Sequence, residues 1–82
     1  MRNYLIDLRY TQELEYVAEE TRYGKTQVIL KGSDGDTYRW DTCKKSAPYK
    51  YIKEHLKGEF EFTYRGELLE HHLVSHLRTI KR

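Results

Sequence analysis

The chain has 82 residues, enough for one domain but few for a deep catalytic cavity. Its 15 basic and 13 acidic side chains leave a formal net charge of only +2, too little to indicate a nucleic-acid partner by itself. No apolar run approaches the roughly 20 residues of a membrane span, the N-terminus lacks the apolar core of a signal peptide, and Cys43 has no second cysteine to pair with. We therefore expect a single cytoplasmic domain without membrane contact.

The N-terminal residues 1–12 predict an arm or a short strand, and the domain itself is expected to span residues 13–82. From residue 13, apolar and charged side chains alternate, with Leu14, Tyr16 and Ala18 on the side away from the glutamates. This period of two predicts a strand with one solvated face.

Two glycine turns follow this strand. Gly24 is the first, and Asp34-Gly35, a strong hairpin signal, is the second. They bound a β-branched run over residues 26–31 and an aromatic run over residues 36–42. The sequence therefore predicts three consecutive strands joined by hairpins.

A short helix is predicted over residues 49–56. Ser46 is suited to cap its start, and Pro48 is suited to its first turn. Apolar side chains recur at spacings of three and four, which predicts one buried stripe about two turns long. The stripe consists of Tyr49, Ile52 and Leu56.

Two further strands complete the chain. Residues 59–65 alternate and predict a strand whose inward side chains are Phe60, Phe62 and Tyr64. Residues 68–80 predict a last strand, or one that is helical at its start, with Leu73 and Leu77 facing inward.

The order of three strands, one short helix and two strands is that of the OB-fold, a five-stranded barrel with its helix between the third and fourth strands. We therefore predict an all-β fold, a closed barrel with the helix covering one end. The expected core consists of Val28, Leu30, Ile52, Leu56, Phe60 and Phe62.

Short motifs over residues 28–30, 35–42, 58–66 and 77–81 support this architecture. They include Trp40-Asp41-Thr42, Tyr64-Arg65-Gly66 and a closing Leu-x-x-x-Lys pattern that contains Arg78. With these motifs the chain resembles the OB-fold single-stranded DNA-binding domains of phages and mobile elements. The resemblance implies a non-catalytic module for replication or recombination that binds single-stranded DNA with low sequence specificity.

The candidate site combines aromatic rings that stack bases with cations that meet phosphates. We expect the stacking residues to be Trp40, Tyr38 and Tyr64, and the phosphate contacts to be Arg39, Lys31, Lys44, Lys45, Arg65 and Arg78. Trp40 has two interpretations, a stacking platform or a core residue packed beside Tyr38, since both share one side of a strand. The platform is favoured because other apolar residues already supply the inward pattern.

A metal centre or an enzyme active site is not expected. His72 and His76 lie about 13 Å apart on a strand, too far to share an ion, so surface histidines are the expectation. Cys43 with His71 or His76 is the only nucleophile and base combination, and no glycine-rich elbow or phosphate loop accompanies it. We expect no cofactor.

A protein-interaction module of the same shape, an accessory protein of a phage or mobile element, is the alternative function. The near-neutral charge and the acidic first strand favour it, and its partner would be a protein such as one of the replication machinery. Convergence of the basic residues on one face would favour nucleic acid instead. The choice between DNA and RNA and the oligomeric state stay open.

Overall fold

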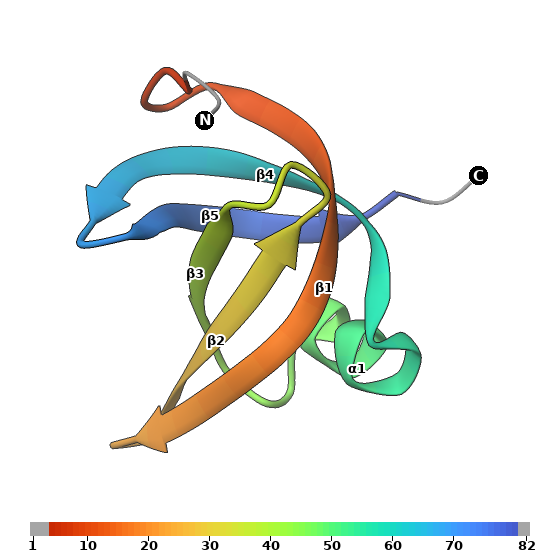
Figure 1. The fold of residues 1–82 in the computed structure, drawn as a ribbon. Coiled ribbons are helices and arrows are strands. Elements are labelled where there is room, and N and C mark those ends of the chain that lie inside the picture. Colours follow the sequence, from red (N-terminus) through yellow and green to blue (C-terminus); the bar gives the residue numbers. More distant parts are fainter. Residues whose placement is uncertain (1–3, 81–82) are drawn as a thin grey trace.

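A computed structural model describes residues 4–80. Its elements are β1 (Arg9–Arg22), β2 (Lys25–Gly32), β3 (Thr37–Thr42), α1 (Ala47–His55), β4 (Lys57–Leu68) and β5 (His71–Thr79). The strands close a barrel in the order β1-β2-β3-β5-β4, in which only β3 and β5 run parallel (Figure 1). This order, with the helix between β3 and β4, is that of the OB-fold, so the predicted fold class is confirmed.

The predicted turns join the first three strands. Tyr23 and Gly24 both have positive φ, 51° and 79°, as the tight turn between β1 and β2 requires. Gly35 has a φ of 89° in the turn between β2 and β3. Because these turns set the register, Arg22 lies opposite Lys25 in the first hairpin.

The first strand starts earlier than the sequence predicts and contains a bulge. Residues 9–15 of β1 pair with β4, so residues 9–12 belong to the barrel. The pairing with β2 shifts between Tyr16 and Ala18, and this extra residue displaces the following side chains by one position. The expected alternation is therefore wrong beyond the bulge: Ala18 is exposed, and Glu19 turns toward α1.

The helix covers one end of the barrel, beside the start of β4 (Figure 1). Ser46 caps it by accepting a hydrogen bond from the Tyr49 backbone N–H, and Pro48 lies in its first turn, as predicted. Ile52 is fully buried, but Leu56 is 54% exposed and its predicted burial is wrong. Leu56 ends the helix in a left-handed conformation, with a φ of 63°, which removes it from the apolar stripe. No helix within residues 4–80 is long and apolar enough to span a membrane.

The fifth strand is displaced by one residue from its predicted inward pattern. Leu69 has a φ of 58° and lies in the turn between β4 and β5, so no helix precedes the strand. His72 and Val74 are buried, whereas Leu73 is half-buried on the outside. Leu77 is nevertheless inside, as predicted, three positions after Val74. The residue before it, His76, has a φ of 51°, which interrupts the alternation.

Aromatic side chains fill the end of the barrel where β3 and β5 begin. Tyr4 stacks on Tyr64 with ring centroids 4.9 Å apart and meets His72 edge-on at 5.1 Å. Its hydroxyl lies 2.6 Å from that of Tyr38. The segment before β1 is thus packed against the core through Tyr4, although it lies outside the strands.

A carboxylate joins α1 to β1. Glu19 accepts hydrogen bonds from the Tyr49 hydroxyl at 2.9 and 3.0 Å and from the Tyr16 hydroxyl at 2.9 Å, and it pairs with the Lys53 ammonium at 2.9 Å. The Lys53 contact is the largest cause that lowers the pKa of Glu19 below its ordinary value, with the tyrosine hydroxyls adding to it and burial opposing it. The charged form of Glu19 is therefore the one that holds the helix to the barrel.

The side chain of Phe60 is fully buried against α1 and β1, so its removal should strongly destabilise the protein. Phe60→Ala should lower the free energy of unfolding by about 3–5 kcal/mol, because it removes apolar contacts and leaves a cavity. Urea denaturation measures this change. Leu69→Ala, at a side chain that is 89% exposed, is the control and should leave stability nearly unchanged. A Phe60→Ala protein as stable as the parent would contradict the fold.

The helix anchor predicts a pH dependence. Because its pKa is lowered on folding, Glu19 stabilises the native state above the ordinary carboxyl range, and this contribution is lost as the pH falls. Glu19→Gln should cost about 1–3 kcal/mol near neutral pH and little in acid, measured by urea denaturation at several pH values. Glu15→Gln, at an exposed position of the same strand, should change neither stability nor its acid dependence. Equal effects of the two substitutions would exclude the anchor.

Candidate nucleic-acid interface

The outer surface of the barrel carries a row of side chains across four strands. The register aligns Ala18 of β1 with Ile29 of β2, Ile29 with Arg39 of β3, and Arg39 with Leu73 of β5. All four are exposed or half-buried, so they point away from the core. We call the outer surface centred on this row the β2–β3 face; the row itself is apolar except at Arg39.

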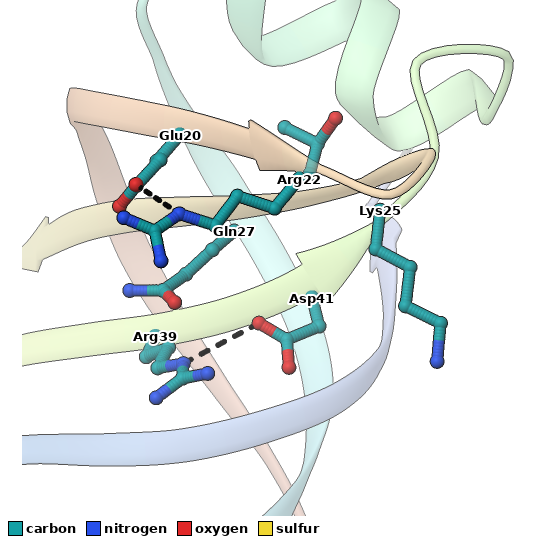
Figure 2. A pocket seen from close by; sticks show the side chains of 7 residues that line it. Glu20, Arg22, Lys25, Gln27, Arg39 and Asp41 are labelled. Atoms are coloured by element: carbon teal, nitrogen blue, oxygen red, sulfur yellow. Dashed lines mark hydrogen bonds and ion pairs between the residues drawn. The ribbon is translucent and has the colours of Figure 1, made fainter.

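A polar depression lies between this row and the β1–β2 turn. Its volume is about 310 Å³, at the lower end of the range for small-molecule sites. The lining residues are Glu20, Arg22, Lys25, Thr26, Gln27, Arg39 and Asp41 (Figure 2). Three cations and two carboxylates thus share one small surface, with a local surplus of positive charge.

The ion pairs in the depression are exposed and weak. Arg22 pairs with Glu20 at 2.6 Å, and Arg39 with Asp41 at 3.4 Å (Figure 2). Such surface pairs contribute at most about 1 kcal/mol each, so Arg22 and Arg39 can exchange them for contacts with a ligand at little cost. Within residues 4–80, Lys25 makes no ion pair, and its charge is available to a ligand.

The rim near the β1–β2 turn adds an aromatic ring and two lysines. Tyr23, at the tip of the turn, is fully exposed. A second depression of about 330 Å³ joins this turn to the end of β3, where Cys43 lies beside Lys25. Lys44 and Lys45 follow directly and are exposed. The rim therefore offers one ring and several cations next to the polar depression.

The three predicted stacking residues lie inside the barrel instead. Trp40 is 4% exposed, Tyr38 is fully buried and Tyr64 is 5% exposed, so the stacking assignment is corrected and Trp40 is a core residue. The Tyr38 hydroxyl donates to Asp34 at 2.8 Å, and burial is the largest cause that raises its pKa. Large rings occupy these positions because a five-stranded barrel has few side chains with which to fill its interior.

Four of the six predicted phosphate contacts lie on or next to the β2–β3 face, but they do not gather at one point. Arg39 and Lys31 are diagonal neighbours on this face, whereas Lys44 and Lys45 follow the end of β3 that is opposite to Lys31. The other two lie on β4 and β5, where Arg65 pairs with Asp7 at 2.5 Å and Arg78 with Glu61 at 2.6 Å. In the barrel order β4 is separated from β3 by β5 and from β2 by β1, so Arg65 is not part of this face.

Several residues of the face were missed by the sequence reasoning, namely Arg22, Tyr23, Lys25, Gln27 and Asp41. A signal for them was present. Three of them, Arg22, Tyr23 and Lys25, flank or form the predicted Tyr23-Gly24 turn, and the loop between strands 1 and 2 is a ligand-binding loop in OB-folds. Asp41 was the harder case, because only the β2–β3 register brings it opposite Gln27.

One histidine contradicts the expectation of a solvated surface. His72 is 3% exposed, and its Nε2 lies 3.0 Å from Asp36, while its Nδ1 lies 3.3 Å from both Glu67 and the Tyr64 hydroxyl. These carboxylates meet opposite sides of the ring, so they tie the β2–β3 turn to β4 rather than converge on one point. Among residues 4–80 no group of three or more histidine, cysteine or acidic side chains is placed to hold a metal ion.

Comparison with known proteins gives no relative for this chain. No family model, no curated protein and no solved structure matches it. The barrel topology and the side chains of the β2–β3 face are therefore the basis for a functional assignment.

Proposed function

We propose that this chain binds single-stranded nucleic acid, without catalysis, through the β2–β3 face. The observation that carries the proposal is the polar depression with Arg22, Lys25 and Arg39, bordered by the exposed ring of Tyr23. Cations beside an exposed ring are the combination by which single strands are held, since phosphates meet charge and bases meet π-faces. The strands and loop involved are those with which OB-folds bind oligonucleotides.

Each part of the β2–β3 face has a distinct role in this proposal. The apolar surface of Ile29 and Leu73 receives bases, and Tyr23 stacks a further base at the rim. Lys25, Lys44 and Lys45 neutralise phosphates as the strand passes the β1–β2 turn. Phosphate contacts and stacking carry little base information, which supports a binder of low overall sequence specificity.

The sequence motifs are a second support. Their resemblance to single-stranded DNA-binding domains of phages and mobile elements favours DNA as the ligand and replication or recombination as the setting. In that setting the chain protects or presents a transient single strand.

A protein-interaction module is the second candidate, favoured by exposed leucines away from the β2–β3 face. Leu68 and Leu69 at the β4–β5 turn are 46% and 89% exposed, and Leu5 and Ile6 are each 63% exposed. Apolar side chains at the tip of a turn suit a protein partner. This candidate predicts no salt-dependent affinity for any single strand.

The rim lysines give the first test, by fluorescence anisotropy of labelled oligo-dT, oligo-dA and a mixed-sequence strand at several salt concentrations. Replacing Lys44 and Lys45 together with alanine should weaken binding similarly for all base compositions. The log–log salt slope should become flatter by about 0.7 for each phosphate that the variant no longer neutralises. The matched control is Arg65→Ala with Arg78→Ala, which removes the same charge from β4 and β5 and should leave the slope unchanged.

Two outcomes would contradict the proposal. An equal effect of the two double variants would mean that the β2–β3 face is not the site. If the parent protein shows no salt-dependent affinity for any single strand at micromolar concentration, nucleic-acid binding fails and the protein-interaction candidate replaces it.

Tyr23 gives the second test. Tyr23→Asn removes the ring and leaves an Asn-Gly turn, the preferred sequence for this positive-φ geometry, so folding should be unimpaired. Binding of oligo-dT should weaken by about 1–3 kcal/mol, the usual contribution of one stacked base. Tyr23→Phe keeps the ring and should bind like the parent. Unchanged binding by Tyr23→Asn would remove the turn from the interface.

A further inference from the structure

Asp41 and Gln27 form an unusual pair for a surface that binds a polyanion. The register places them directly opposite each other on β3 and β2, and both line the polar depression (Figure 2). The Asp41 side chain is 59% exposed, and its one ion pair among residues 4–80 is the 3.4 Å contact with Arg39. Its carboxylate oxygens therefore retain capacity to accept hydrogen bonds from a ligand.

Two carboxylates of the depression oppose a phosphate placed next to them. Glu20 and Asp41 both present carboxylates there, and like charges at this range oppose a phosphodiester. The cations lie beside them, with Arg22 and Lys25 toward the β1–β2 turn and Arg39 toward the apolar row. A strand whose phosphates follow the cations can then present a base, rather than a phosphate, to Asp41.

The chemistry of the bases decides which one fits a carboxylate. The Watson–Crick edge of guanine carries two adjacent donors, N1–H and the N2 amino group, beside the O6 acceptor. Adenine and cytosine set one amino donor beside a ring nitrogen acceptor, and thymine flanks its single N–H with two carbonyls. Only guanine therefore donates two parallel hydrogen bonds to one carboxylate without opposing it with a lone pair.

We propose that Gln27 and Asp41 bind a guanine base of the single strand by its Watson–Crick edge, an inference that rests on the proposed function. Asp41 accepts from N1–H and N2–H, and the Gln27 amide or the Arg39 guanidinium donates to O6. Figure 2 shows the ends of these three side chains on the same side of neighbouring strands. The strand is thus held without sequence preference along most of its length and is read at one position.

Competition binding with short oligo-dT that carries one central replacement base tests this directly. A single guanine in thymidines forms no guanine quadruplex, so the comparison reports on one base. The guanine oligonucleotide should bind about ten-fold more tightly than those with adenine, cytosine or thymine, the usual discrimination of a bidentate pair. Inosine, which lacks only the N2 amino group, should lose most of this advantage. Free guanosine monophosphate should compete poorly, because it lacks the flanking phosphates.

Asp41→Asn identifies the residue responsible. A carboxamide presents one acceptor and one donor, which can pair with a donor and acceptor on the Watson–Crick edge of each of the four bases, so the guanine preference should be lost. Glu15→Gln makes the same charge change on the same face, beside Lys31, and should keep the guanine preference. The thermal midpoint of both variants checks that folding is retained.

The outcomes separate this inference from the function on which it rests. Equal binding of all four bases by the parent protein overturns the guanine site and leaves single-strand binding intact. A guanine preference that persists in Asp41→Asn overturns the assignment to Asp41. Absence of binding to any oligonucleotide overturns the proposed function and the guanine site together.

Discussion

The barrel depends on one irregularity in its longest strand, the bulge between Tyr16 and Ala18. β1 pairs with β4 along its first half and with β2 along its second, so it must bend for the barrel to close. The extra residue also turns Glu19 toward the helix and leaves Ala18 on the outside. The bend of β1, the docking of α1 through Glu19 and the outward position of Ala18 therefore share one cause.

The packing of the barrel interior determines which aromatic side chains remain on the surface for binding. The core contains Tyr38, Trp40 and Phe62. Large rings are needed there because few side chains point into a barrel of five strands. Tyr23 is the exposed ring that remains beside the polar depression. We therefore expect the proposed single strand to be held mainly by cations, with an affinity that depends strongly on salt.

The charge balance of the whole chain understates the character of this surface. Several acidic side chains of β1 are already paired within the fold, Glu13 with Lys57, Glu19 with Lys53 and Glu20 with Arg22. Within residues 4–80 the lysines of the rim, Lys25, Lys44 and Lys45, make no ion pair. The acidic first strand is therefore weak evidence for a protein partner, and the charge that a ligand meets at the rim is positive.

The sequence by itself determined the element order, the hairpin turns, the helix cap and most of the core, because period-two alternation and glycine turns act locally. It did not determine which side of a strand faces inward after a bulge, and so it misplaced Ala18, Leu73 and His72. It also could not show that Trp40 is enclosed, since a core ring and a stacking ring have the same pattern. Pairing between distant strands alone decided that Gln27 lies opposite Asp41 and that Arg65 is remote from Arg39. The pairing register between strands determines which side chains meet on the β2–β3 face, and the local sequence of each strand does not specify that register.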